Sequence, residues 1–145
     1  MKRMNIAFAA FVAAAFLSGC GQESGPGDGT IVLDERVFIQ QVTEITMEMD
    51  NFVGQTVRYE GLFGTISSSI TGREHNWVIR LMVCCDPLGE PIGFFVDIGE
   101  REPFPNDTWV EVTGVLEAYL GFGFRVPQLE VIEIREVTPG NAHVW

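Results

Sequence analysis

Between residues 38 and 52, apolar side chains recur at intervals of four and three, which is the period of a helix with one buried face. These side chains belong to Phe38, Val42, Ile45, Met49 and Phe52. Asp34 stands where an N-cap is needed, and Gly54 follows where the helix has to end. The pattern predicts an amphipathic helix over about residues 35–50 whose apolar face packs on the rest of the domain.

From Gln55 onward, apolar and polar residues alternate in short runs, as they do in half-buried β-strands. Gly61 and Gly64 interrupt the first run, as glycines do where a barrel strand bends sharply. The predicted strands cover residues 56–63, 77–84, 91–97, 109–116 and 129–135. This order predicts a mainly β fold, a small five-stranded OB-like barrel preceded by one amphipathic helix. An SH3-like barrel or a small sandwich is the alternative, because the usual OB helix lies between the third and fourth strands.

The first twenty residues follow a different pattern. Two basic residues precede an apolar run over residues 6–17, and Ser-Gly then leads to Cys20. The run is shorter than the roughly 20 residues of a membrane-spanning helix and has the layout of a secretory signal peptide. Leu-Ser-Gly-Cys resembles the bacterial lipobox, in which the cysteine is diacylated and becomes the new N-terminus. We therefore expect a lipid anchor at Cys20 in the cell envelope, on the extracytoplasmic side, and in the outer membrane if the cell has one.

Cleavage of the signal peptide, residues 1–19, would divide the remaining chain into three parts. Residues 20–30 are expected to be a lipidated flexible tether, residues 31–138 the OB-like β domain, and residues 139–145 a loose tail. Cleavage removes two of the 9 basic residues and none of the 20 acidic ones, which changes the net charge from −11 to −13. Because this charge repels phosphates, we expect no nucleic-acid partner and attachment to the membrane through the acyl chains alone.

Residues that could carry catalysis are scattered along the chain. His75 lies in a polar stretch and His143 in the tail, and the serines at 67–69 lack the Gly-x-Ser-x-Gly elbow of a hydrolase nucleophile. The chain has neither a phosphate-binding glycine loop nor the Cys-x-x-Cys spacing of a zinc site. We therefore expect a protein without enzymatic activity.

Cys84 and Cys85 are the remaining candidates for chemistry, because lipidation would consume Cys20. Neighbouring residues of a strand point to opposite faces, so both thiols can serve one site only if the strand ends there. The proline two residues further on favours such an end. The two thiolates would then select zinc or copper(I), with His75, Asp86 or a partner protein supplying further ligands. A strained disulfide between the neighbours and a buried apolar cysteine are the alternatives.

Five stretches form a pattern over most of the expected domain: residues 51–57, 60–63, 78–85, 91–94 and 107–114. Its most specific part is the Cys-Cys pair with Pro-x-Gly after it. The pattern resembles the C-terminal domain of the YcgQ-like family, bacterial membrane proteins regarded as permease components. The resemblance implies a membrane-tethered module outside the cytoplasm that associates with a permease and handles a metal. Relatives have an aspartate where this chain has Leu88, and transmembrane helices where it has the lipobox.

These observations predict an anchored binding module that holds a soft metal ion at the cysteine pair and associates with a permease. One alternative is an envelope-interaction or structural lipoprotein without a metal, which binds a ligand on the barrel face. For that alternative Phe122 and Phe124 are the candidate contact residues, because the loop before the last strand of an OB fold borders the binding face. The same two rings could instead turn inward into the core. A thiol redox protein is the third alternative, although no lysine would remain after cleavage of residues 1–19 to stabilise a thiolate.

Overall fold

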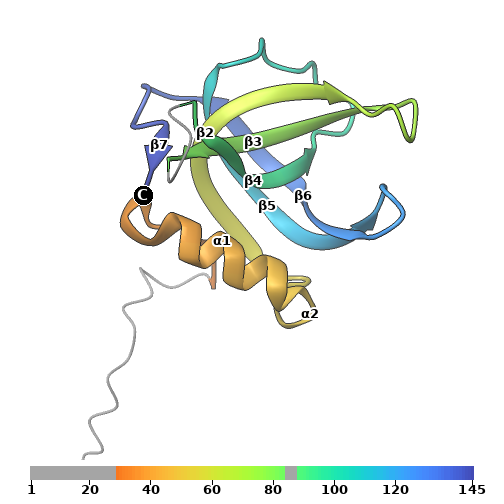
Figure 1. The fold of residues 1–145 in the computed structure, drawn as a ribbon, viewed down its shortest axis with the longest axis horizontal. Coiled ribbons are helices and arrows are strands. Elements are labelled where there is room, and N and C mark those ends of the chain that lie inside the picture. Colours follow the sequence, from red (N-terminus) through yellow and green to blue (C-terminus); the bar gives the residue numbers. More distant parts are fainter. Residues whose placement is uncertain (1–28, 84–87) are drawn as a thin grey trace, which may run out of the picture.

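The computed structural model describes residues 29–83 and 88–145 as one domain of seven strands and two short helices (Figure 1). The N-terminal elements are β1 (Ile31–Val32), the 3-10 turn η1 (Glu35–Val37), α1 (Phe38–Met47) and α2 (Met49–Phe52). The strands that follow are β2 (Thr56–Ser67), β3 (Glu74–Met82), β4 (Glu90–Asp97), β5 (Trp109–Leu120), β6 (Arg125–Glu136) and β7 (His143–Val144).

Strands β2 to β6 form a closed five-stranded barrel. The sheet has the order β1-β2-β5-β6-β4-β3-β7, and an additional pairing between β2 and β3 closes it. Within the barrel β4 and β6 run parallel, and the other neighbours are antiparallel. This closed, mainly β arrangement confirms the predicted OB-like fold, and all five predicted strands are present.

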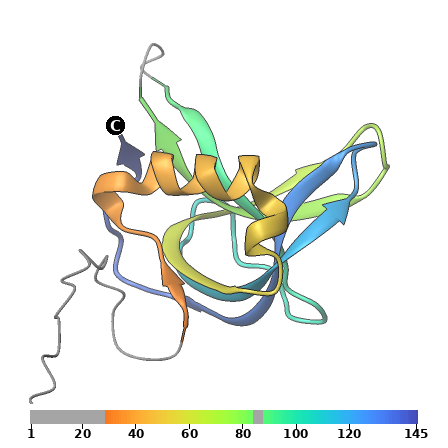
Figure 2. The same cartoon turned by 90° about the horizontal axis from the view of Figure 1, so that it is seen from below.

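The predicted amphipathic helix is present but divided. Asp34 caps η1, since its carboxylate accepts a hydrogen bond from the Arg36 N–H at 2.8 Å. The backbone of Glu48 leaves the helical region at φ −112° and ψ 33°, which separates α1 from α2. Helix α1 lies across one end of the barrel (Figures 1 and 2) and buries Phe38, Val42 and Ile45 there. It therefore closes the barrel with a helix that precedes all five barrel strands.

Strand β2 bends at Gly61, as the sequence predicts. Up to Leu62 the strand pairs with β5, and from Leu62 onward it pairs with β3. A Cβ at Gly61 would lie only 2.7 Å from the carbonyl oxygen of Ile79, so a side chain does not fit at this crossing. The bend allows one strand to pair with both of its neighbours and so to close the barrel.

The expectation of a loose tail over residues 139–145 is wrong at its end. Strand β7 pairs in parallel with the end of β3, and Val144 is buried in the core. The reason is the bend in β2, which leaves this edge of β3 without a partner from β2. The N–H groups of Leu81 and Val83 donate to the carbonyls of Ala142 and Val144, at 2.7 and 3.1 Å. The tail thus satisfies backbone groups that would otherwise be unpaired.

Candidate binding face

The hairpin of β5 and β6 extends beyond the barrel and folds over β3 and β4. Strand β6 pairs with β4 only over Gln128–Glu130, whereas its pairing with β5 continues to the hairpin end at Leu120 and Arg125. Figures 1 and 2 place the tip of this hairpin at the same end of the molecule as the β2–β3 hairpin. This end carries a concentration of aromatic side chains.

We call this surface the aromatic face. Its residues are His75 and Trp77 of β3, Phe95 of β4, Tyr119 of β5, and Phe122 and Phe124 of the hairpin tip. On β3 and β4 these residues alternate with the core residues Val78, Phe94 and Val96, so they lie on the outside of the barrel. The sequence predicted Phe122 and Phe124 as contact residues and His75 only as a possible metal ligand; it did not point to Trp77, Phe95 or Tyr119. A signal for these further residues was present in the sequence. Strand β3 is apolar at consecutive positions, which is typical of a strand that is covered on both faces.

Four of the rings form a row. Trp77 and Phe95 are partners across β3 and β4, with ring centroids 6.4 Å apart and planes inclined by 22°. Phe95 and Phe122 follow at 5.2 Å and 33°, and Phe122 and Phe124 at 6.2 Å and 35°. Trp77 and Phe95 are therefore stacked, the next two pairs are tilted, and together the four rings form an extended apolar row.

His75 packs against this row. Its ring lies 4.9 Å from that of Phe122 and 5.9 Å from that of Tyr119, and it is only 8% exposed. Its Nε2 is 3.2 Å from Oγ1 of Thr71, within hydrogen-bond distance. His75 thus has a ring environment and a polar partner that hold it in the aromatic face.

The two phenylalanines predicted from the sequence have different environments. Phe122 is partly buried between His75 and Phe95, whereas Phe124 is 62% exposed. Leu120 of the same hairpin and Ile70 in the β2–β3 hairpin are also exposed, at 71% and 78%. Both hairpins at this end therefore present large apolar side chains to solvent.

The predicted metal ligands and the lipidation site fall mostly outside the described residues. Cys20, Cys84, Cys85 and Asp86 are among the residues not described. His75 lies near the start of β3, about 20 Å along the strand from Met82, at the rise of a β-strand. Within residues 29–83 and 88–145, no three His, Cys, Asp or Glu side chains are grouped so that they could hold a metal ion.

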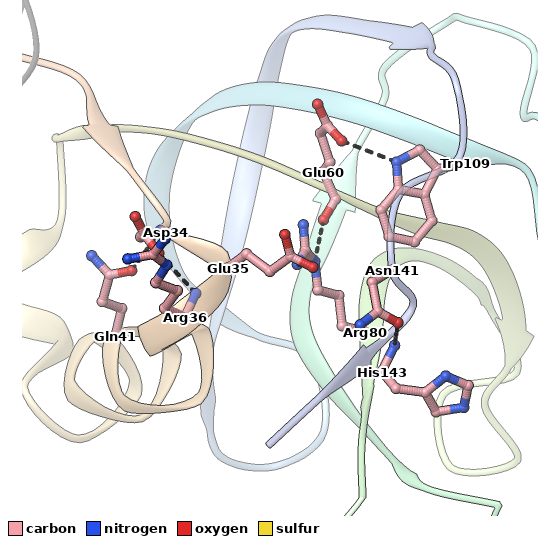
Figure 3. Close-up of polar contacts among 9 residues, drawn as sticks. All are labelled: Asp34, Glu35, Arg36, Gln41, Glu60, Arg80, Trp109, Asn141 and His143. Carbon is pink, nitrogen blue, oxygen red and sulfur yellow. Dashed lines mark hydrogen bonds and ion pairs between the residues drawn. The ribbon is translucent and has the colours of Figure 1, made fainter.

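A second cluster surrounds Arg80, at the point where β2 turns away from β3 (Figure 3). The guanidinium lies between the rings of Phe38 and Trp109, at 5.0 and 5.4 Å from their centroids. Its Nε donates to the carbonyl of Glu60 at 2.9 Å, and the Glu60 carboxylate accepts from the indole N–H of Trp109 at 3.1 Å. Arg80 therefore fills the gap left by the bend in β2.

Arg80 also joins the N-terminal segment to the barrel. Its Nη1 is 3.8 Å from the carboxylate of Glu35 in η1, and this nitrogen has no hydrogen-bond partner among the described residues. Burial lowers the pKa of the guanidinium, and the charges of Glu35 and Glu60 act in the opposite direction. Because the Arg80 guanidinium is packed against two aromatic rings, we assign Arg80 a structural role. The aromatic face is therefore the candidate site.

A comparison with protein families identifies the family of the chain. The family model of the DUF1980 C-terminal domain matches residues 21–145, which confirms the resemblance to the C-terminal domain of YcgQ-like proteins. No curated protein matches the chain. Among the described residues, no helix has the length and apolar character needed to cross a membrane.

Proposed function

The chain belongs to the family of the DUF1980 C-terminal domain, and on that premise we propose that it is a non-enzymatic binding module whose ligand docks on the aromatic face. The observation that carries the proposal is the row of rings ending in the exposed Phe124. In OB folds the face of the second and third strands, together with the loops beside it, binds ligands. In this barrel the second and third strands are β3 and β4, and the loops beside them belong to the β2–β3 and β5–β6 hairpins.

The proposal includes presentation outside the cytoplasmic membrane on a lipid anchor at Cys20, next to a permease. The support is the lipobox and the family's association with membrane proteins. In both overall views β1, where the described chain begins, lies away from the two hairpins (Figures 1 and 2). An anchor joined to β1 through a short tether would leave the aromatic face directed away from the attachment point. A Cys20→Ala variant should then leave the membrane fraction, and unchanged membrane association would contradict the anchor.

Site-specific crosslinking in intact cells tests the aromatic face. With p-benzoylphenylalanine in place of Phe124, illumination should give a discrete adduct with an envelope component. Met47 is a matched control, since it is 80% exposed but lies on α1. An adduct that forms equally well from position 47, or no adduct from position 124, would contradict a binding role of this face.

A second candidate function is binding of a soft metal ion, zinc or copper(I), by Cys84 and Cys85. It is favoured by the bounds of the strands, because β3 ends at Met82 and β4 begins only at Glu90. The pair therefore follows a strand end, as shared ligation by neighbouring residues requires. Metal titration of the reduced protein should show binding that Cys84→Ser and Cys85→Ser each weaken. Equally weak binding by all three proteins would exclude this function.

A matched pair of further variants tests which residue completes such a site. Asp86 is the nearest acidic residue in the sequence, whereas His75 lies within the aromatic face. Asp86→Asn should therefore weaken metal binding more than His75→Ala does. The reverse order would show that His75 is the ligand.

A further inference from the structure

A shallow groove runs along the outside of the barrel beside Trp77, on the side away from Phe95. Its volume is about 210 Å³. We call it the Trp77 groove, and its lining includes Leu62, Gly64, Thr65, Ile66, Asn106 and Asp107. Trp77 belongs both to this groove and to the row of rings, so the two form one continuous surface across β2, β3 and β4.

The position of the Trp77 indole depends on a glycine in the neighbouring strand. Gly64 of β2 is the partner of Trp77 across the β2–β3 pairing. A Cβ at Gly64 would overlap Nε1 of the indole, so the ring lies over bare backbone. This packing holds the ring close to the sheet as one wall of the groove.

Two of the residues that line the groove, Asn106 and Asp107, have polar side-chain groups that are free to bind a ligand. The side-chain oxygen of Asn106 accepts from the Thr65 N–H at 2.9 Å, which fixes the amide and leaves its NH₂ group without a partner among the described residues. Asp107 has φ +67°, a left-handed conformation that costs energy for a residue other than glycine. Its N–H donates to the Phe63 carbonyl at 2.8 Å, and its carboxylate has no partner in the described part of the chain.

From this surface we infer that the ligand is an uncharged oligosaccharide lying along the Trp77 groove and the row of rings. The inference rests on the proposed function, since it names the ligand class of the same face. Flat rings match the apolar faces of sugar rings, while an amide donor and a carboxylate acceptor match their hydroxyl groups. No cationic side chain lines the groove, and it carries the carboxylate of Asp107. An anionic polysaccharide or a nucleic acid would therefore be repelled, as the net charge also requires.

Calorimetry on the full chain in lipid nanodiscs tests the inference, because nanodiscs avoid detergents with sugar headgroups. The probes are cellotetraose, chitotetraose and maltotetraose, with tetragalacturonate as the anionic comparison. We expect at least one neutral tetrasaccharide to bind and tetragalacturonate not to bind. Trp77→Ala should weaken binding about tenfold or more, as loss of a stacking ring does. Trp145→Ala is the matched control, because Trp145 is a tryptophan that is 82% exposed and follows β7, outside the Trp77 groove and the row of rings.

A second variant keeps the test decisive if Trp77→Ala does not fold. Asp107→Gly removes the carboxylate and is compatible with the left-handed backbone, so it should fold at least as well as the natural chain while binding the sugar more weakly. Absence of binding by all three neutral probes, or equal binding of tetragalacturonate, would overturn the inference. If the position 124 adduct forms but no tetrasaccharide binds, the glycan assignment fails and the binding face stands. If neither the adduct nor tetrasaccharide binding is seen, both the glycan assignment and the binding role of the aromatic face are wrong.

Discussion

The hydroxyl of Tyr59 bonds to two barrel strands from inside the core, and Tyr59→Phe removes only that hydroxyl. Tyr59 is 2% exposed, and its ring packs between those of Phe38 and Phe94. The hydroxyl donates to the carbonyl of Val78 at 2.7 Å and accepts from the N–H of Phe94 at 3.2 Å. It thus joins β3 and β4 from inside the core, at a point that water does not reach.

The expected cost follows from the two backbone groups that lose a partner. A buried donor or acceptor left unsatisfied costs about 1–3 kcal/mol, and the ring of phenylalanine fills the same space without replacing either bond. We therefore expect Tyr59→Phe to lower the free energy of unfolding by about 2–4 kcal/mol. This is a large part of the 5–15 kcal/mol typical of a domain.

Urea unfolding followed by circular dichroism measures this difference. The chain offers a matched control, since Tyr119 is its other tyrosine, is partly exposed, and has no hydrogen bond to its hydroxyl in the described part of the chain. Tyr119→Phe should change the free energy by less than about 0.5 kcal/mol. The denaturant slope should be the same in all three proteins, which would show that only stability has changed. If Tyr59→Phe cost no more than Tyr119→Phe, the hydroxyl would not be bridging the strands.

Three further predictions concern pH, the Trp77 groove and the buried arginine. Burial raises the pKa of the Tyr59 hydroxyl well above its ordinary value, so the unfolded chain loses this proton at a lower pH than the folded chain does. The free energy of unfolding should therefore fall above about pH 10, by up to about 1.4 kcal/mol per pH unit. Tyr59→Phe should remove this slope in urea titrations at alkaline pH. Gly64→Ala should displace the Trp77 indole, which would shift its fluorescence and weaken sugar binding while the circular dichroism spectrum stays that of a β barrel. Arg80→Ala should cost about 2–4 kcal/mol, because a bond to a backbone carbonyl and two ring contacts are lost. Glu35→Gln should cost under about 1 kcal/mol, since that carboxylate is 57% exposed; equal costs for these two variants would contradict the structural role of Arg80.

The barrel was predictable from the sequence because its signals are local. Alternation in the strands and the glycine at position 61 are read from neighbouring residues, and they predicted both the strand order along the chain and the bend in β2. The position of β7 was not predictable, because it depends on an edge of β3 that only the bend exposes. The break between α1 and α2 at Glu48 also has no clear signal, since the apolar spacing continues through it.

The candidate site was predictable only in part, for a related reason. Phe122 and Phe124 could be found from the usual place of the loop in an OB fold. The partners of Phe122 on β4 and β3, Phe95 and His75, lie 27 and 47 residues earlier in the sequence, and only the folding of the hairpin over the sheet brings the rings together. The Trp77 groove likewise needs Gly64 and Asp107, 43 residues apart in the sequence, to come together on the outside of the barrel. The hydrophobic periodicity of a sequence predicts single helices and strands, and it does not predict contacts between residues so far apart.

The closure of the barrel has a consequence for how copies of the chain behave when they are crowded. A sheet that ends in a long open strand invites strands from neighbouring molecules and leads to aggregation. In the described part of the chain, the sheet ends in β1 and β7, which have two residues each. These two short edges give a neighbouring molecule almost no backbone to pair with. Strand β6, by contrast, pairs with β4 only over Gln128–Glu130 and has no other described strand on that side. Backbone pairing between copies held side by side would therefore have to use β6 and not the ends of the sheet.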